Sequence, residues 1–262
     1  MERISSRQNA TVKRFRDLSR GESGGDWMLL DGEHLLEEAL ASGARVDVAA
    51  FTEGLATGRL APLVAQTERA GAQIFTVTEQ VLTAVSPVRQ PSGVVAIVRR
   101  REATIDEVFE RKPSLVLMLS AVQDPGNVGA IIRVAEGCGA TGIVAGNGTA
   151  DPFGWKALRG AMGSTLRLRV ATRQSLAEAV ARARAAGLRI FATAARNGTP
   201  LPRCDLRGPS AILLGGEGPG LAEDLLAAAD ERVTIPMRPP VESLNVAVAA
   251  ALVLYEASRQ RS

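Results

Sequence analysis

The sequence predicts an α/β protein of two domains, the second of which is built on a parallel β-sheet. Its 262 residues are enough for two hydrophobic cores of ordinary size. Short apolar runs alternate along the chain with segments whose apolar residues recur at helical spacing. A highly charged stretch ending in a proline interrupts this alternation. We therefore expect a first domain at 1–98, a linker with at most one helical turn at 99–113 and a second domain at 114–262.

The first domain is expected to be a small α/β unit. It opens with a basic leader that is predicted to form a helix over about residues 9–19. The buried strands expected after the leader are residues 27–32, 45–51, 72–77 and 93–99. The helices expected between them are residues 32–43, 60–70 and 78–86.

The second domain repeats the alternation of strand and helix over a longer stretch. The strands expected here are residues 114–122, 141–146, 166–171, 188–195, 211–216 and 233–237. The helices expected are residues 127–139, 153–163, 175–187 and 221–229, followed by a last helix that Ser243 caps. Such alternation predicts a parallel sheet covered on both faces, with ligands bound beyond the carboxyl ends of the strands.

Composition excludes several classes of protein. Hydrophobic residues are 46% and charged residues 23% of the chain, which is an ordinary globular balance. The longest apolar run, residues 246–255, is shorter than the roughly 20 residues of a membrane-spanning helix. The N-terminus is basic and lacks an apolar stretch, so no secretory signal is expected and the cytoplasm is the predicted location. Cys138 and Cys204 are predicted to be free thiols without a metal, and the single His34 leaves little room for histidine-based catalysis.

The positive charge of the chain is almost entirely arginine, a residue that binds phosphate through two parallel hydrogen bonds. Taken as composition alone, this is equally compatible with a codon bias and with nucleic-acid binding. Its distribution favours nucleic acid, because basic residues crowd two segments. These residues are Arg3, Arg7, Lys13, Arg14, Arg16 and Arg20 in the leader, and Arg99, Arg100, Arg101, Arg111 and Lys112 in the linker.

Three turns of the second domain each follow an apolar strand and open a helix. In the first, Asp124 to Asn127 form the turn and Arg133 lies six positions beyond Asn127. That spacing is nearly two helical turns, so the arginine is expected to share a face with the turn. The alternative is an ordinary turn followed by a surface arginine.

The second turn, GGEGPG, contains four glycines but matches neither of the common phosphate-binding patterns. A dinucleotide fingerprint requires a glycine where this chain has Leu221, and the lysine of a P-loop is missing. The glycines therefore favour a close backbone approach to a flat or uncharged ligand. Glu217, in the middle of the turn, suits a cationic ligand or a hydroxyl group.

The third turn, IPMRPPVESLNVA, is stiffened by three prolines before the last helix begins. A helix cap is a sufficient explanation for Ser243. It does not explain Asn245, which heads an otherwise apolar run and is therefore expected to have a buried polar partner.

The motifs DPGNVGAIIR, LLGGEGPGL and IPMRPPVESLNVAVA, in this order, resemble the three signature motifs of the SpoU branch of the SPOUT methyltransferases. Members of this family are RNA ribose 2′-O-methyltransferases that use S-adenosylmethionine. The resemblance covers the whole second domain. More loosely, ISSRQNATVKRFRDL, LLDGEHLLEEAL and SPVRQPSGVVAIV in the first domain resemble the ribosomal-protein-like RNA-binding domain of many such enzymes.

The resemblance implies a C-terminal segment threaded as a trefoil knot, a homodimer and an RNA substrate, with ribosomal RNA favoured over transfer RNA. It implies the active-site residues Asn127, Arg133, Glu217, Ser243 and Asn245. The residues expected to contact S-adenosylmethionine are Thr193, Ala194, Leu214, Gly215, Gly216, Glu217, Gly218, Ile235, Met237, Ser243 and Leu244. Those expected to contact RNA are Arg7, Lys13, Arg14, Arg133, Lys156 and Arg159.

Two other functions compete with this interpretation. One is an RNA-binding or ribosome-assembly factor that keeps the fold without the activity, although the polar residues expected for activity are all present. The other is a Rossmann-type methyltransferase acting on protein or a small molecule. It is disfavoured because its glycine motif would follow the first strand of the domain, whereas GGEGPG lies near the end.

Overall fold

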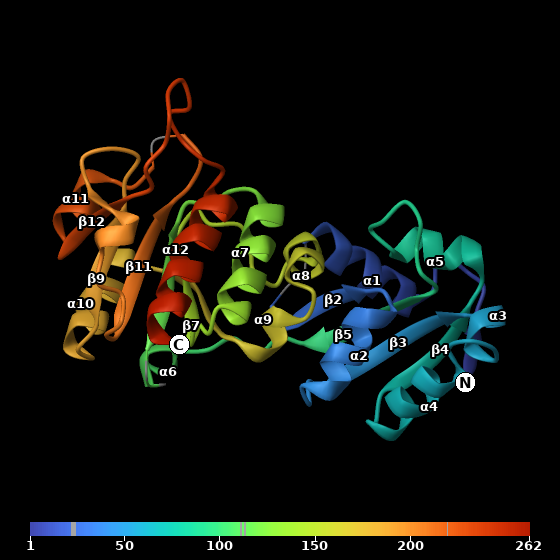
Figure 1. The fold of residues 1–262 in the computed structure, drawn as a ribbon. Helices are drawn as coiled ribbons and strands as arrows, with labels where there is room; N and C mark the ends of the chain where they lie inside the picture. Colours follow the sequence, from blue (N-terminus) through green and yellow to red (C-terminus); the bar gives the residue numbers. More distant parts are fainter. Residues whose placement is uncertain (22–24, 111, 113, 219) are drawn as a thin grey trace. The chain divides into compact units, whose positions relative to one another are not determined.

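Two β-sheets organise the chain in the computed structural model, one of five strands and one of seven in the part described (Figure 1). The structure describes residues 1–21, 25–110, 112, 114–218 and 220–262. Arg111 and Pro113 of the predicted linker and Pro219 of the glycine-rich turn lie outside these residues. Unit 1 consists of Met1–Arg101 and Phe153–Arg167, and unit 2 of Glu102–Pro152 and Leu168–Ser262.

Unit 1 contains the five-stranded sheet, in the order β1-β4-β3-β5-β2. Strand β5 runs antiparallel to β3 and β2, while the other pairs are parallel. Its strands are β1 (Glu2–Ile4), β2 (Trp27–Asp31), β3 (Val46–Thr52), β4 (Gln73–Val77) and β5 (Val94–Arg99). Its helices are α1 (Ala10–Arg20), α2 (Glu33–Ala41), α3 (Glu53–Ala56), α4 (Ala61–Arg69), α5 (Glu79–Val85), α8 (Trp155–Ala161) and α9 (Ser164–Arg167).

The basic leader forms α1 because its apolar residues lie at helical spacing behind a good cap. The Asn9 side chain accepts a hydrogen bond of 2.8 Å from the Thr11 amide, and Val12, Phe15 and Leu18 are buried. These three residues join side chains of α5 and of the sheet in one hydrophobic cluster. The predicted strands and helices of this region are all present, whereas the short β1 and α3 carried no periodic signal.

Unit 2 contains the seven-stranded sheet, and every strand pair in it is parallel, as predicted. The order is β10-β12-β9-β11-β6-β7-β8. Its strands are β6 (Leu115–Ser120), β7 (Gly142–Gly146), β8 (Arg169–Gln174), β9 (Arg189–Thr193), β10 (Thr199–Pro200), β11 (Ser210–Gly215) and β12 (Glu231–Thr234). Its helices are α6 (Ile105–Glu110), α7 (Pro125–Gly137), α10 (Leu176–Ala185), the 3₁₀ turn η1 (Leu201–Arg203), α11 (Glu223–Ala227) and α12 (Val246–Arg261).

Helices cover both faces of this sheet. On one face, α6, α10 and α11 bury residues such as Phe109, Val180 and Leu225 in a single cluster with alternate residues of the strands. Helices α7 and α12 lie against each other, and α12 also packs on β11 (Figure 1). Because both faces are covered, β6 and β11 are apolar and almost entirely buried.

The predicted linker is partly a structural element of unit 2. Residues 105–110 form α6, whose Val108 and Phe109 are buried in the core of that unit. The chain passes from unit 1 to unit 2 between Arg101 and Glu102. The sequence indicated at most a single helical turn here, because the stretch is highly charged and only two of its side chains are needed to anchor the helix.

Residues 153–167 differ most from the sequence-based division, because they pack within unit 1. Arg100 stacks on Phe153 with 4.3 Å between the guanidinium carbon and the ring centroid, and Arg167 forms an ion pair with Glu38. Residues 164–167 are the helix α9, so the strand predicted at 166–171 begins at Arg169 instead. Periodicity predicts a helix but does not say which core that helix covers.

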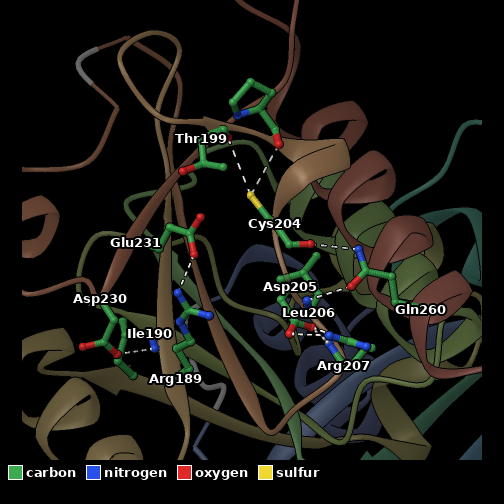
Figure 2. Close-up of polar contacts among 11 residues, drawn as sticks. Arg189, Ile190, Thr199, Cys204, Asp205, Leu206, Arg207, Asp230, Glu231 and Gln260 are labelled. Carbon is green, nitrogen blue, oxygen red and sulfur yellow. Dashed lines mark hydrogen bonds and ion pairs between the residues drawn. The ribbon is translucent and has the colours of Figure 1, made fainter.

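The last helix begins after Asn245, which is its cap, so the prediction that Ser243 caps it is wrong. Serine and asparagine are equally good caps, and the path of the preceding loop decides between them. At its other end, Gln260 accepts a hydrogen bond of 2.8 Å from the Leu206 amide and donates one of 2.9 Å to the Cys204 carbonyl (Figure 2). The loop after η1 is thereby tied to the end of α12.

Candidate active site

The first and second turns meet because the strands before them are neighbours. In the register of β6 and β11, Gly215 lies opposite Ser120, and the Gly216 amide donates a hydrogen bond of 2.7 Å to the Ser120 carbonyl. A β-carbon on Gly216 would stand 2.0 Å from the Ala121 carbonyl oxygen. Glycine is therefore required at 216 for the two turns to touch.

Asp124 builds the first turn by capping α7. Its Oδ1 accepts hydrogen bonds from the Gly126 amide at 2.6 Å and the Asn127 amide at 3.1 Å, and Pro125 occupies the first helical position. Asn127 is thereby fixed in the first turn of α7, at the carboxyl end of β6.

A directed chain of hydrogen bonds links the three turns. Asn245 Oδ1 accepts from the amides of Ala247 at 2.9 Å and Val248 at 3.4 Å, so its Nδ2 is left to donate to Asn127 Oδ1 at 3.2 Å. The Asn127 Nδ2 in turn donates to Glu217 Oε1. Because the helix amides can only donate, the cap fixes the orientation of both asparagine side chains.

The chain of hydrogen bonds ends at the carboxylate of Glu217, which can accept further hydrogen bonds. Glu217 and Asn245 are exposed and Asn127 is half-buried. An ionised carboxylate accepts more hydrogen bonds than the one that Asn127 gives it, so Glu217 can also accept one from a hydroxyl group of a ligand. The buried partner expected for Asn245 is absent from the described residues, because its polar atoms are used by the helix amides and by Asn127.

A cavity of about 480 Å³ opens beside this chain of hydrogen bonds, a volume typical of small-ligand sites. It lies beyond the carboxyl ends of β9, β11 and β12 and the start of α12. Every residue predicted to contact a cofactor lines it, namely Thr193, Ala194, Leu214, Gly215, Gly216, Glu217, Gly218, Ile235, Met237, Ser243 and Leu244. Among the described residues the lining includes one carboxylate and no basic side chain, which disfavours a polyphosphate and fits a cation.

Sequence reasoning missed the other residues of the lining. These are Ala195, Gly220, Leu221, Leu226, Val233, Asn245, Val246 and Ala249, of which Asn245 had been assigned to the active site but not to the cavity. Most are small or apolar, and their sequence positions are explained equally well by the hydrophobic core. The sequence places Asp124 in a turn, and its position directly before Pro125 is typical of a helix cap.

Arg133 lies on α7 but not on the same face as Asn127. Six residues of a helix turn through about 600°, which leaves the two side chains about 120° apart around the axis. The expectation of a shared face is therefore wrong. Arg133 is exposed and makes no side-chain hydrogen bond or ion pair with the residues that the structure describes. Ser243 lines the cavity without capping the helix.

The other residues predicted to contact RNA belong to unit 1. Arg7 and Lys13 are exposed, whereas Arg14 is paired with Asp47 at 2.5 Å and stacks on Trp27. The Lys156 ammonium lies 5.4 Å from the ring centroid of Trp155.

Arg159 has a neighbour that suggests a second role. Its guanidinium is 3.9 Å from the carboxylate of Asp31, a residue that is 6% exposed. Burial raises the pKa of Asp31, while a hydrogen bond from Ser86 and the charge of Arg159 oppose that rise. Arg159 thus compensates a buried charge within unit 1.

The described residues contain neither a membrane-spanning helix nor a metal-binding cluster. No helix there is long and apolar enough to cross a membrane, and no group of three or more His, Cys, Asp or Glu side chains there could hold a metal ion. Both cysteines are free thiols, as predicted. His34 is exposed on α2. Burial raises the pKa of the Cys204 thiol to about 11, with the nearby Glu231 contributing (Figure 2).

Comparisons with known proteins agree with the geometry of this site. Residues 114–255 match the model of the SpoU rRNA Methylase family, and residues 29–104 match RNA 2′-O ribose methyltransferase substrate binding. The chain is 36% identical to an uncharacterized tRNA/rRNA methyltransferase of Synechocystis, over 98% of this chain and 94% of that one. It is 34% identical to the 23S rRNA (guanosine(2553)-2′-O)-methyltransferase RlmP of Bacillus subtilis, over 97% and 98% of the two chains.

A solved structure gives the same result for the fold. The AdoMet-bound rRNA methyltransferase of Sinorhizobium meliloti superimposes with a TM-score of 0.88 at 28% identity, covering 98% of this chain and 97% of that one. The match therefore includes both units and the region of the cavity. The chain belongs to the SpoU rRNA methylase family and is an RNA 2′-O-ribose methyltransferase.

Proposed function

We propose that this protein transfers the methyl group of S-adenosylmethionine to a ribose 2′-hydroxyl of 23S ribosomal RNA. The observation that carries the proposal is the chain of hydrogen bonds from Asn245 through Asn127 to Glu217 at the edge of the cavity. We infer 23S ribosomal RNA as the substrate from the similarity to RlmP of Bacillus subtilis, which extends over nearly the whole of both chains. Such a substrate also implies a cytoplasmic enzyme.

The residues around the cavity fit S-adenosylmethionine. Backbone groups of Gly215, Gly216 and Gly218 and the apolar side chains of Leu214 and Ile235 offer a surface for a flat, uncharged ring. Glu217 supplies the one charge of the lining, opposite in sign to a sulfonium. When bound, S-adenosylmethionine supplies an electrophilic methyl group on a positively charged sulfur.

The chain's own residues would then hold the ribose in line with that methyl group. Asn245 is oriented by the bonds that cap α12 and in turn orients Asn127, so the two amide groups are placed before the sugar binds. Glu217 accepts the hydrogen bond of the 2′-hydroxyl and fixes where its oxygen points. Ser243 offers a further hydroxyl from the lining of the cavity.

We assign Arg133 to the RNA phosphate beside the reacting ribose. Its guanidinium is exposed and makes no side-chain bond within the described residues, so its donors are available. A guanidinium carries its proton near neutral pH and does not act as a proton acceptor there. Its role is therefore positioning and electrostatic stabilisation.

Methyl transfer from tritiated S-adenosylmethionine tests the proposed function. Unmodified 23S ribosomal RNA should be labelled by the purified protein, and bulk transfer RNA should not. Mapping 2′-O-methyl groups in total RNA, with and without the gene, should show the loss of a site in 23S ribosomal RNA. Labelling of transfer RNA alone would reassign the substrate, and labelling of neither RNA would contradict the proposal.

The exposed face of α12 supports a homodimer as the working form. Val248, Leu252 and Tyr255 are 49%, 41% and 66% exposed and recur at positions i, i+4 and i+7, so they form one apolar stripe. A second copy of the chain would cover this stripe, as expected for the family. Light scattering should give twice the monomer mass at micromolar concentration, and Tyr255→Glu should reduce it. A monomeric wild-type protein would overturn the dimer.

A further inference from the structure

A second cavity, of about 240 Å³, lies within unit 1. It is smaller than typical small-ligand sites, so it has room for a phosphate group with part of its sugar and not for a large cofactor. Strand β2, the turn between α2 and β3, the end of β5 and the segment 153–167 form its walls. The residues of its lining are Met28, Ser42, Gly43, Ala44, Arg45, Arg99, Arg100, Arg101, Phe153, Thr165 and Leu166.

The lining of this cavity is strongly basic. It contains four arginines and, among the described residues, no carboxylate. Arg99 is paired with Asp26 at 3.7 Å, whereas Arg45 and Arg101 are exposed and make no side-chain hydrogen bond or ion pair within the described part of the chain. The Arg100 guanidinium lies over the ring of Phe153. Like charges gathered around a small cavity attract an anion.

Thr165 provides an independent sign of a ligand. It is 2% exposed and lines the same cavity, yet its Oγ1 has no hydrogen-bond partner among the described residues. Buried hydroxyl groups are nearly always paired, because an unpaired one loses its bonds to water without replacement. A phosphate oxygen in the cavity would be an acceptor for this hydroxyl.

We propose that this cavity binds a backbone phosphate of the RNA substrate, held by Arg45, Arg101 and the Thr165 hydroxyl. The proposal rests on the proposed function, since it takes the ligand to be the RNA that is methylated. It assigns to unit 1 a defined phosphate contact where the basic composition alone indicated only a general attraction for RNA. Arg45 and Arg101 belong to the first stretch of unit 1 in the sequence, and Thr165 belongs to the second.

Filter binding of an unmodified 23S ribosomal RNA transcript tests this contact. The double variant R45A/R101A should bind at least about tenfold more weakly, and the slope of log affinity against log salt should fall by about two. Thr165→Val removes the hydroxyl and keeps the shape, and it should weaken binding severalfold without lowering the melting temperature. Arg69→Ala, which removes a charge from α4 outside the cavity, is the control and should change affinity less than about twofold.

The outcomes separate this inference from the proposed function. If R45A/R101A binds RNA as Arg69→Ala does, or if Thr165→Val melts higher with unchanged RNA affinity, the phosphate contact is wrong. Calorimetry with inorganic phosphate alone that shows tight binding, lost in R45A/R101A with no change in RNA affinity, would reassign the cavity to a free phosphate. Wild-type protein that binds the transcript through these residues but does not methylate it would overturn the proposed function and leave the phosphate contact standing.

Discussion

The two ends of α12 are held by different kinds of hydrogen bond. At its start, Asn245 caps the helix through its Oδ1, and its Nδ2 donates to another side chain, that of Asn127, in an exposed setting. At its end, Gln260 bonds to the backbone of Cys204 and Leu206 in a partly buried setting (Figure 2). Arg261 likewise donates to the backbone carbonyl of Leu206. The cationic Arg261 also lies where the helix dipole is negative.

This difference separates the part of the helix that does chemistry from the part that anchors it. Side chains that bond to each other near solvent can exchange a partner for a substrate group at little cost. Side chains that satisfy buried backbone groups have no such freedom, because removing them leaves those groups unpaired. Substitutions at the start should therefore affect turnover, and substitutions at the end should affect stability.

The largest effect is expected from Arg133→Lys, on the helix that packs beside α12. Lysine keeps the charge but loses the planar pair of donors, so turnover should fall by about a thousandfold while cofactor affinity and melting temperature stay unchanged. Tritiated methyl transfer measures turnover. The control is Arg182→Lys, the same change on α10, where Arg182 forms an ion pair with Asp106. It should keep turnover within twofold of wild type. A fully active Arg133→Lys protein would show that Arg133 does not have the proposed role at the RNA phosphate.

The next effect concerns cofactor binding at the turn after β11, which lines the cavity together with the start of α12. Gly216→Ala would push a β-carbon against the Ala121 carbonyl, and backbone atoms cannot give way as a flexible side chain does. We expect S-adenosylmethionine to bind at least about tenfold more weakly, measured by titration calorimetry. Gly137→Ala, where a β-carbon meets nothing within 4 Å, should leave the affinity unchanged. Equal affinities for the two variants would show that the turn tolerates displacement.

At the other end of the helix, Gln260→Ala should lower the free energy of unfolding by about 2 kcal/mol, because the Leu206 amide and the Cys204 carbonyl lose their partner. Urea unfolding measures the change. Arg259→Ala removes the neighbouring side chain, which forms an ion pair with Glu256 at the surface, and should cost no more than about 0.5 kcal/mol. The specific turnover of folded Gln260→Ala should match that of wild type, and a large loss would break the separation between the two ends.

The smallest effect is a pH dependence at the same end. Hydrogen bonds from Arg259 and Gln260 lower the pKa of Glu256 from 4.5 to about 2. A carboxylate with a lowered pKa contributes stability that is present above its unfolded value and is lost as pH falls from about 4.5 towards 2. Glu256→Gln should therefore melt below wild type at pH 7, and the difference should shrink by pH 3. A difference in melting temperature that does not depend on pH would show that these bonds do not favour the ionised form of Glu256.

Much of this fold could be predicted from the sequence, because apolar residues recur with a clear period in nearly every strand and helix. The parallel sheet of unit 2 followed from strands alternating with helices, and the cavity followed from turns placed after β11 and β12. The trefoil knot could not be predicted in this way. Its threading is implied by membership of the family and has no counterpart in periodicity.

Other details of the site depend on tertiary structure. Ser243 and Asn245 are both good caps, and only the path of the loop chooses between them. The face of Arg133, by contrast, could have been predicted from the sequence, since six residues do not complete a whole number of helical turns. The cavity of unit 1 combines Arg45 and Arg101 with Thr165, residues that no local pattern connects.

The assignment of residues 153–167 to unit 1 has a consequence for how the chain can be made and divided. The chain passes between the units after Arg101, after Pro152 and after Arg167, so neither unit is a single continuous stretch. During translation, β6, α7 and β7 leave the ribosome before α8 and α9, which means that unit 1 cannot be completed before unit 2 has begun to emerge. A fragment cut within residues 99–113 would lack Phe153 as the stacking partner of Arg100. Exchanging RNA-binding regions between relatives would therefore require two grafted segments, with α8 and α9 moved together with the rest of unit 1.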